Sequence, residues 1–234
     1  MRAALFNGND LSVVNRPLRA IAVDEVLIKV AACGVCGTDI KIVAGHSAAT
    51  PPVVLGHEVA GKVVEIGNEV KRIKVGDRVT SETTAYICGK CRFCQSKDYN
   101  LCPHRRGLGS KVNGAFAEYF VIREMSIHRL PSNIDFISGA LSEPLACATH
   151  AVMEQAKVLE GEVVLVLGPG PLGLLVAQVA KTQGTIVVIC GIRGDESRLA
   201  LAKKLGADET VNLQNKNIGC LLYTSDAADE LDGV

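Results

Sequence analysis

The sequence of 234 residues contains no tryptophan, and its aromatic residues together make up only 4% of the chain. So few aromatic side chains argue against a surface on which nucleic-acid bases stack. The 25 Lys and Arg residues balance the 25 Asp and Glu residues, so no net positive field attracts nucleic acid or an anionic membrane. We therefore expect neither nucleic acid nor a membrane as a partner.

Long apolar runs are also lacking. No stretch of membrane-spanning length is free of glycine, proline and charge, and the first residues carry no apolar core of a secretory signal. An apolar content of 48% still supplies a buried core for one large or two modest domains. We expect a cytoplasmic protein, and in a reducing compartment its 9 cysteines indicate metal binding or catalysis rather than disulfides.

The N-terminal half of the sequence predicts β-structure. Short apolar runs at 26–30, 59–66, 77–81 and 115–121 are separated by glycines, a pattern typical of a compact β-barrel-like domain. His57 and Glu58 stand side by side at the end of a predicted strand, and both are ligand types that zinc accepts. On its own this pair indicates little, because a buried His next to a surface Glu is the commoner arrangement.

Two cysteines and two polar residues follow the first predicted strand, at Cys33, Cys36, Thr38 and Asp39. A bare Cys-x-x-Cys is a redox pair, a zinc knuckle or two buried thiols. A thioredoxin-like redox pair needs a strand-to-helix turn in a small βαβ domain, which this β-rich context does not offer. The other interpretation is a single thiolate ligand with Thr38 and Asp39 as polar helpers.

Four cysteines form the strongest local signal, with spacing C-x2-C-x2-C-x7-C. Four thiolates this close together can enclose one tetrahedral Zn²⁺ and leave no open coordination position. The loop has few apolar residues, so metal rather than a core would hold it together. An iron–sulfur cluster is the competing interpretation, disfavoured by the last gap and by the lack of a second cluster motif. The four residues are Cys88, Cys91, Cys94 and Cys102.

A third group of potential ligands lies near the start of a helical pattern, where Glu143, Cys147 and His150 occur together. Taken alone, this group favours an ordinary helix N-terminus, in which Glu143 interacts with the helix dipole and Pro144 occupies the first turn.

A dinucleotide-binding motif begins after residue 162. The continuous apolar run 163–167 predicts a strand buried on both faces, and a helix to about Gln183 and a second strand over 186–190 follow. Between strand and helix stands G-x-G-x-x-G, whose backbone N–H groups and helix N-terminus receive a pyrophosphate. The residues of this turn are Gly168, Gly170, Pro171, Leu172 and Gly173.

The end of the second predicted strand bears on the choice of nicotinamide. An acidic residue is expected there to bind the ribose 2′-hydroxyl, but Gly191 takes its place and Arg193 follows. The missing carboxylate and the nearby arginine favour NADP over NAD. We interpret Asp195 as the cap of a helix that runs to Leu205, with Gly206 at its C-terminus.

Taken together, these motifs resemble the zinc-dependent medium-chain dehydrogenase/reductase superfamily, and most closely its polyol, sorbitol and threonine dehydrogenase-like branch. The resemblance covers residues 1 to about 213. It implies an α/β plus β fold, in which a GroES-like β-barrel catalytic domain over 1–145 precedes the N-terminal part of a Rossmann domain over 146–219. It also implies a structural-zinc lobe over 86–104.

The resemblance implies roles for single residues. It assigns Cys36, His57 and Glu143 as ligands of a catalytic zinc, and Glu58 as a carboxylate that can enter or leave the metal shell. It leaves Cys33 and Cys147 without a ligand role. The four clustered cysteines correspond to the structural zinc.

Three further residues receive roles in proton transfer and orientation. Thr38 corresponds to the hydroxyl that passes the alcohol proton outward, and Asp39 orients His57. Lys41 stands where many relatives carry a relay histidine. Either Lys41 substitutes for it or the proton leaves directly through water.

The implied activity is hydride transfer between a secondary alcohol or polyol and NAD(P), with zinc polarising the substrate oxygen. A zinc-independent quinone reductase of the same superfamily lacks the clustered cysteines, and the alternative from another class is a noncatalytic zinc-binding module. For a full-length protein we expect a homo-oligomer, a dimer or a tetramer.

The C-terminal end departs from the resemblance. A doubly wound domain needs about six strands, whereas the sequence reaches only the start of a third, around 210–213. Residues 220–234 match nothing in the family and resemble translated sequencing-adapter DNA. We therefore expect a C-terminally truncated chain that has poor solubility and no measurable turnover of its own.

Overall fold

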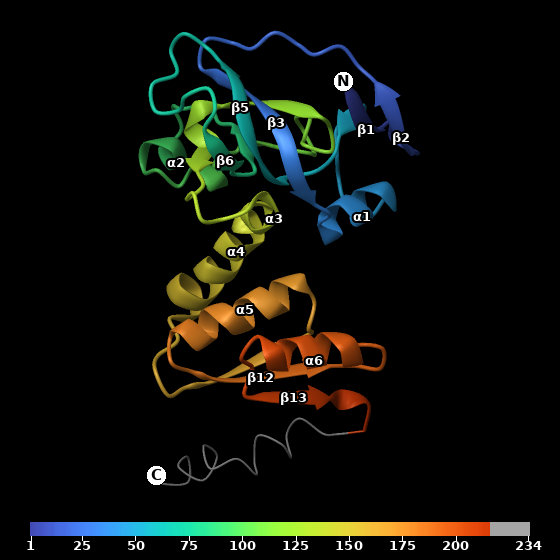
Figure 1. The fold of residues 1–234 in the computed structure, drawn as a ribbon, viewed down its shortest axis with the longest axis vertical. Helices are drawn as coiled ribbons and strands as arrows, with labels where there is room; N and C mark the ends of the chain where they lie inside the picture. Colours follow the sequence, from blue (N-terminus) through green and yellow to red (C-terminus); the bar gives the residue numbers. More distant parts are fainter. Residues whose placement is uncertain (216–234) are drawn as a thin grey trace. The chain divides into compact units, whose positions relative to one another are not determined.

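The computed structural model describes residues 1–215, which fall into two compact units (Figure 1). The first unit ends at Glu143 and the second begins at Pro144, two residues before the boundary predicted from the sequence. The adapter-like tail predicted over 220–234 lies outside the described residues. None of the described helices has both the length and the hydrophobicity of a membrane-spanning segment.

The first unit is built from antiparallel sheets, as the β-rich sequence predicts. A five-stranded sheet has the order β10-β6-β5-β3-β9, a three-stranded sheet has the order β2-β1-β4, and β7 pairs with β8. The strands are β1 (Arg2–Phe6), β2 (Leu11–Asn15), β3 (Glu25–Gly34), β4 (Val53–Val54), β5 (Glu58–Ile66), β6 (Arg78–Ser81), β7 (Thr84–Tyr86), β8 (Arg106–Gly107), β9 (Tyr119–Arg123) and β10 (Ile127–Arg129).

Short helices connect these strands or follow them. The α-helices are α1 (Gly37–Val43), α2 (Arg92–Gln95), α3 (Phe136–Ala140) and α4 (Ser142–Thr149), with the 3-10 helices η1 (Tyr99–Leu101) and η2 (Glu124–Ser126) and the π-helix η3 (His150–Ala156).

The core of the first unit comes from alternate positions of neighbouring strands. Val26 and Ile28 of β3 point inward together with Val59 and Val63 of β5. Side chains of a strand alternate between its two faces, so these residues share one face; Leu27 and Ala60 on the other face are buried as well. The sheet thereby places the ends of β3 and β5, where the candidate ligands lie, on a rigid support.

Two predicted strand boundaries are wrong. The strand predicted over 115–121 begins only at Tyr119, because the backbone at Ala115 and Phe116 instead donates to the carbonyls of Gly56 and Leu55. His57 and Glu58 do not end a strand: His57 lies between β4 and β5, and Glu58 is the first residue of β5. Residues 114–118 therefore fix, through backbone hydrogen bonds, the segment that carries His57.

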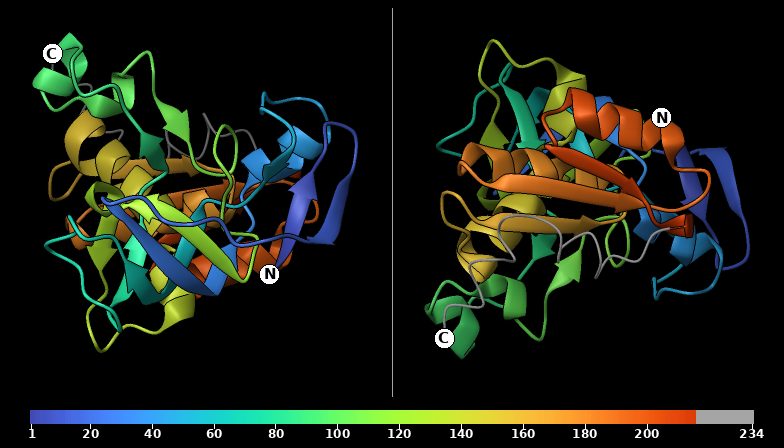
Figure 2. Two further views of the ribbon diagram at one scale, coloured as in Figure 1. Left: turned by 90° about the horizontal axis from the view of Figure 1, so that it is seen from above. Right: turned by 90° about the horizontal axis from the view of Figure 1, so that it is seen from below.

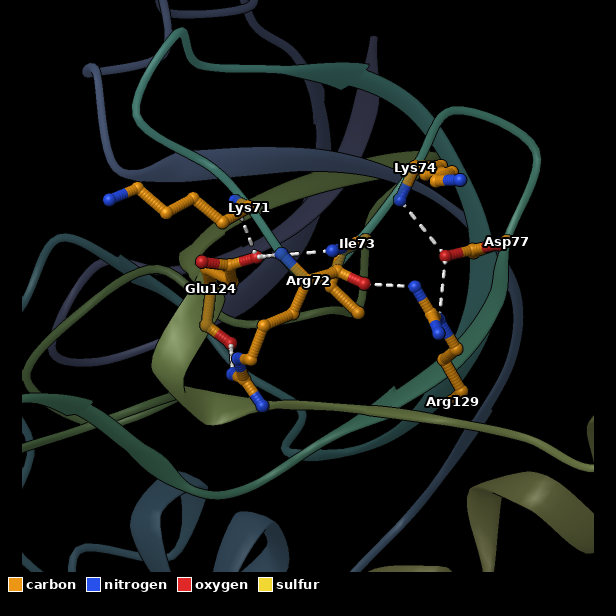
Figure 3. Close-up of polar contacts among 7 residues, drawn as sticks. All are labelled: Lys71, Arg72, Ile73, Lys74, Asp77, Glu124 and Arg129. Carbon is orange, nitrogen blue, oxygen red and sulfur yellow. Dashed lines mark hydrogen bonds and ion pairs between the residues drawn. The ribbon is translucent and has the colours of Figure 1, made fainter.

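A polar network fixes the connection between β5 and β6 (Figure 3). One carboxylate oxygen of Glu124 accepts hydrogen bonds from three successive backbone N–H groups, those of Lys71, Arg72 and Ile73, at 3.0 Å from Lys71 and 3.1 Å from Ile73. The guanidinium group of Arg72 donates in return to the carbonyl oxygen of Glu124, at 2.7 Å. A single carboxylate thus accepts hydrogen bonds from three backbone N–H groups that lie outside the strands and are not paired in a sheet.

The other end of the same connection is held by Asp77. Its carboxylate accepts from the backbone N–H of Lys74 at 2.9 Å and from the guanidinium group of Arg129 at 2.9 Å (Figure 3). These contacts lower the pKa of Asp77 against the opposing effect of desolvation.

Replacing Glu124 with alanine is expected to lower the free energy of unfolding by about 1–2 kcal/mol, because three backbone donors lose a charged acceptor at once. Urea denaturation of the purified protein measures the effect. Glu69→Ala is the matched control, since Glu69 is exposed in the same connection and its side chain takes no part in the network. Equal stabilities of the two variants would contradict the prediction.

The second unit begins as a parallel α/β fold. Strands β11 (Val163–Leu167), β12 (Ile186–Gly191) and β13 (Glu209–Asn212) lie side by side in that order, in parallel register (Figure 2). Helices α5 (Pro171–Thr182) and α6 (Glu196–Lys204) follow β11 and β12, and the 3-10 helix η4 (Leu213–Asn215) follows β13. Ala177 of α5 and Leu199 of α6 share one core cluster with Val187 and Ile189, so both helices cover the same face.

The prediction that residues 163–167 are buried on both faces is wrong. Only Val166 is buried, and Leu167 is 68% exposed, whereas every residue of β12 after Ile186 is buried. Among the described strands β11 forms one edge of the sheet and β12 its centre. A continuous apolar run alone does not distinguish the two positions.

Candidate metal and cofactor sites

The four clustered cysteines converge on one point. The Sγ atoms of Cys88 and Cys94 are 4.0 Å apart, those of Cys91 and Cys94 3.6 Å, and those of Cys88 and Cys102 3.7 Å. A tetrahedral zinc with Zn–S bonds of about 2.3 Å requires sulfurs about 3.8 Å apart. The distances therefore fit a four-sulfur zinc site, as the cysteine spacing predicts.

The thiols of this group also shift one another's pKa. Backbone N–H groups of Lys90 and Cys91 lower the pKa of Cys88 to about 6, whereas desolvation and the adjacent sulfurs raise the pKa of Cys94 to about 12. Four thiols that share so small a space cannot all ionise unless a positive charge lies among them. The four sulfurs lie close enough together for one metal ion to bind all of them.

A second group of ligand atoms comes from three separate elements. Cys36 precedes the first turn of α1, His57 lies between β4 and β5, and Glu58 starts β5. One ligand atom from each residue lies within 4.8 Å of the other two. Thiolate, imidazole and carboxylate are all ligands that zinc takes at a catalytic site.

Asp39 contacts the backbone or side chain of the segments that carry Cys36 and His57. It is only 3% exposed, and its carboxylate accepts from the backbone N–H of Cys36 at 3.0 Å and from that of Gly56 at 3.3 Å. The same carboxylate lies 3.6 Å from Nδ1 of His57 and raises the pKa of that imidazole to about 9, against desolvation. Asp39 therefore occupies the orienting position predicted for it, and its field favours positive charge at the group.

The other residues of the Cys33–Lys41 segment are arranged as follows. The hydroxyl of Thr38 lies 3.6 Å from the sulfur of Cys36, and Thr38 and Lys41 are both exposed. Cys33 lies outside the ligand group and packs against the core, where burial raises the pKa of its thiol to about 12. Zinc binds the thiolate form of cysteine, so a partly buried Cys33 with a raised thiol pKa is a poor zinc ligand.

Two glycines make room for the ligands, and the sequence alone did not single them out. Gly34 pairs with Glu58 across β3 and β5, and a Cβ added there would lie 2.2 Å from Oε2 of Glu58. Gly56 has a φ of 90°, and a Cβ added there would lie 2.5 Å from the ring of Phe116. Gly56 therefore has no room for a larger residue, whereas a side chain at Gly34 would have to displace the Glu58 carboxylate.

Replacing Gly34 with alanine is expected to displace the Glu58 carboxylate and to weaken metal binding at this group by about tenfold to a hundredfold, in line with changes next to other metal ligands. The four-cysteine site is expected to keep its metal. Competition between the protein and a chromogenic chelator for Zn²⁺ measures both affinities. Gly37→Ala is the control, because a Cβ at Gly37 meets open space; equal affinities of the two variants would refute the displacement.

The remaining predicted ligand, Glu143, lies in the first turn of α4 and is half-buried. Cys36, His57 and Glu58 form the group without it. The helix start that the sequence indicates for this segment is present, with Pro144 buried behind Glu143. A ligand role for Glu143 stays a prediction.

The glycine-rich turn between β11 and α5 has the shape that a pyrophosphate needs. Gly168 has a φ of 99°, and a Cβ at Gly168 or Gly170 would meet open space, so a ligand can approach the backbone there. A Cβ at Gly173 would lie 2.0 Å from the carbonyl oxygen of Gly168. Pro171 begins the helix with Gly170 as its N-cap, and Leu172 is exposed. The turn therefore fits a dinucleotide.

Asp195, which follows β12, does not make the capping bond that the sequence predicts. It stands at the N-cap position of α6, but its carboxylate accepts hydrogen bonds from the backbone N–H of Ile192 at 3.1 Å and from Arg198 at 3.1 Å.

The residues on either side of Asp195 are arranged as follows. A Cβ at Gly191 would lie 3.0 Å from Cβ of Asp195, so position 191 has little room for a side chain. Arg193 is exposed, and Gly206 ends α6 with a φ of 101°, as predicted.

Two family models match the sequence. The model described as "Alcohol dehydrogenase GroES-like domain" matches residues 22–132, and the model described as "Zinc-binding dehydrogenase" matches residues 171–223. The two matches lie in the order that the fold shows, with the β-rich unit before the parallel sheet.

Individual proteins resemble the chain over most of its length. A D-arabitol-phosphate dehydrogenase of Enterococcus avium is 50% identical and a sorbitol dehydrogenase of Halalkalibacterium halodurans 48% identical, each over 83% of this chain and 56% of the relative. A dehydrogenase structure from Sinorhizobium meliloti 1021, bound to NADP, has a TM-score of 0.86 and 35% identity over 93% of this chain and 63% of that one. The chain thus spans little more than half the length of these curated relatives.

Proposed function

The chain belongs to the zinc-containing medium-chain alcohol dehydrogenase family, in its sorbitol and threonine dehydrogenase-like part, and we propose that the protein is a zinc-dependent oxidoreductase. In this proposal it transfers a hydride between a secondary alcohol or polyol and NAD(P). The fold of the family, a GroES-like domain followed by Rossmann-type parallel strands, is the fold of this chain.

The observation that carries the proposal is the convergence of Cys36, His57 and Glu58 within 4.8 Å. We propose these three residues, with Glu143, as the ligand set of one zinc, and the four clustered cysteines as that of a second, structural zinc. A bound zinc at the first site supplies Lewis acidity toward the substrate oxygen, and a bound nicotinamide takes the hydride. The four-sulfur site, being closed, has no position for substrate.

The remaining roles fall to side chains around that group. Asp39 keeps the ring of His57 in place through its carboxylate, and its bonds to the backbone at 36 and 56 hold two ligand-bearing segments at a constant spacing. The exposed hydroxyl of Thr38, beside Cys36, receives the alcohol proton and passes it outward. Lys41, exposed on the same helix, is the candidate that completes the path to water.

The cofactor is proposed to bind at the turn 168–173. Backbone N–H groups at the start of α5 and the open space at Gly168 and Gly170 support binding of the pyrophosphate. Arg193 is exposed next to the end of β12, where a 2′-phosphate would lie, and this supports NADP. An Arg193→Ala variant that lost affinity for NADP but not for NAD would bear out that preference, and equal loss for both would contradict it.

The substrate class follows from the relatives. One acts on an arabitol phosphate and another on sorbitol, according to their names. We propose a small polyol or secondary alcohol for this protein.

Metal analysis and an activity assay test the proposal. Because the chain spans 56% of the Enterococcus avium relative, turnover is measured on a chimera that joins residues 1–212 to the C-terminal part of that relative. Two zinc equivalents and NAD(P) reduction with D-arabitol, sorbitol, threonine or 2,3-butanediol are expected. Reduction must disappear when Cys36 is replaced by serine within the chimera.

The alternative is a noncatalytic zinc-binding protein, since the closed four-sulfur group could hold a metal without any position for substrate. Two zinc equivalents without any turnover of the chimera would select this alternative. A purified chain without zinc would refute both functions.

A further inference from the structure

A cavity of about 400 Å³ lies where the four-cysteine lobe, residues 86–104, meets the β7–β8 ladder. Five basic side chains line it, and among the described residues no carboxylate does. We call it the basic cavity, and its basic residues are Lys90, His104, Arg105, Arg106 and Lys111. It shares no lining residue with the group of Cys36, His57 and Glu58, so a ligand in the cavity is bound apart from the proposed alcohol substrate.

Arg105 is held in place at this cavity. Its guanidinium group donates to the hydroxyls of Thr84 and Thr83, at 2.8 Å in both cases, and Thr84 is buried. These bonds use two of the five N–H groups of the guanidinium and neutralise none of its charge. Arg105 therefore presents a positive charge at a fixed place, with further donors for a ligand.

The other four basic side chains of the cavity are exposed. In the part of the chain that the structure describes, none of the five forms an ion pair with Asp or Glu. The guanidinium carbon of Arg106 lies 5.1 Å from the ring centroid of Tyr86, which restricts where Arg106 can point. Like charges held close together without a counter-ion repel each other, so an anion in the cavity lowers the energy of the group.

A competing explanation is that these cations balance the charge of the lobe itself, because four thiolates around one Zn²⁺ carry a net charge of about −2. The four Lys and Arg side chains of the cavity exceed that charge and leave about +2. Arg106 and Lys111 moreover follow the lobe in the chain, in β8 and in the connection after it. Charge balance thus accounts for part of the cluster and leaves charge that matches a dianion.

The donors of the cavity favour a phosphate group. A guanidinium fork donates to two phosphate oxygens at once, and the remaining oxygens of the tetrahedral group can accept from a lysine on another segment. A planar carboxylate has fewer oxygens to share among such donors. The ring of Tyr86 is already in contact with Arg106 and with Arg123, whose guanidinium carbon lies 4.9 Å from its centroid, so stacking of a nucleotide base is not favoured.

We propose that the basic cavity binds a phosphate dianion, either free phosphate or the phosphate of a monoester, and that the bound anion keeps the lobe closed on the β7–β8 ladder. Lys90 and His104 belong to the lobe, whereas Arg106 and Lys111 do not. An anion that contacts both sets loses donors when the lobe opens, so its binding favours the closed lobe. The site does not depend on the proposed dehydrogenase function.

Calorimetric titration of the zinc-loaded 234-residue chain at constant ionic strength tests binding, with inorganic phosphate, ethyl phosphate and chloride as probes. Inorganic phosphate is expected to bind and chloride is not. Ethyl phosphate carries no alcohol group, so it cannot act as a substrate. Tighter binding of ethyl phosphate than of inorganic phosphate would identify a monoester as the ligand, and the reverse order would identify free phosphate.

Substitutions in the cavity are expected to change this affinity. Arg106→Ala and Lys111→Ala should each weaken phosphate binding by about tenfold to a hundredfold, because each removes a charge-assisted donor. Lys111→Arg is expected to retain binding, since the charge remains. Arg92→Ala is the matched control, because Arg92 is exposed in the same lobe and does not line the cavity.

Tryptic cleavage after Arg92 and Lys97 measures opening of the lobe, since neither residue lines the cavity. With phosphate at ten times its dissociation constant, cleavage there is expected to slow by about tenfold, because the population of the open lobe falls by that factor. In Lys111→Ala the same phosphate concentration should slow cleavage much less.

Three results would overturn the proposal. Phosphate affinity could be the same in Arg106→Ala, Lys111→Ala and the unaltered chain, or phosphate could leave the cleavage rate unchanged. Loss of phosphate binding in His57→Ala would place the anion at the other ligand group, since the cavity predicts unchanged binding in that variant. If the chimera fails to reduce NAD(P) while phosphate binding still depends on Arg106 and Lys111, the proposed function fails and the anion site stands.

Discussion

Replacing Cys94 with alanine is expected to lower the zinc content of the purified protein from two equivalents to one and to unfold residues 86–104. The lobe has almost no core of its own: among its cysteines only Cys102 is buried, Leu101 is 57% exposed, and α2 has 4 residues. Structural zinc contributes roughly 10–16 kcal/mol of apparent binding free energy in small zinc domains. Without it, nothing of comparable size holds the lobe together.

Zinc content after dialysis and the rate of tryptic cleavage at Lys90, Arg92 and Lys97 measure the effect. Cys147→Ala is the control, because Cys147 is exposed and lies outside both ligand groups. An unchanged zinc content and cleavage rate in Cys94→Ala would show that the lobe folds without metal.

Replacing His57 with alanine is expected to remove the other zinc equivalent and to leave the four-cysteine site loaded. His57 is the imidazole of its group, and its loss leaves Cys36 and Glu58 with the Asp39 carboxylate close behind them. A Lewis acid contributes several kcal/mol to such a reaction, so hydride transfer by the chimera should fall by about 10³-fold or more.

His128→Ala provides the comparison for this variant, because His128 pairs with Glu82 on the surface at 2.8 Å and belongs to neither ligand group. Zinc content and NAD(P) reduction are measured in parallel. A His57→Ala protein that still holds two zinc equivalents would remove His57 from the proposed ligand set.

The sequence predicted best those features that depend on neighbours along the chain. The strand over 163–167, the turn 168–173 and the left-handed Gly206 all lie where the local pattern puts them. The same holds for the convergence of Cys88 and Cys94, because a short loop brings closely spaced cysteines together whatever surrounds it. Local geometry determines each of these features.

Features that depend on contacts across the fold escaped sequence reasoning. Gly34 matters only because β3 pairs with β5 and brings it opposite Glu58, and no local signal at residue 34 shows this. Likewise, the partners of Arg105 are Thr83 and Thr84, which the β7–β8 ladder brings beside it. The contacts of Arg105 are therefore known only once strand pairing is known.

Asp195 shows a different kind of limit. Its position before a helix is typical of a cap, and the helix does begin there. The carboxylate instead bonds to Ile192 and Arg198 and lies near the end of β12. The choice between two nearby sets of donors is a matter of side-chain rotamer, which residue type alone does not determine.

The β7–β8 ladder has a consequence for how metal enters and leaves the lobe. Thr84 pairs with Gly107 and Tyr86 with Arg106, so both ends of the lobe are tied together at its base. Pairing of β7 with β8, and not metal binding, therefore offsets the conformational entropy that is lost when the loop between Tyr86 and Arg106 closes. The lobe can open and close as a local unit while the barrel stays folded. Loss of zinc is therefore expected to open the lobe while the two strands at its base stay paired.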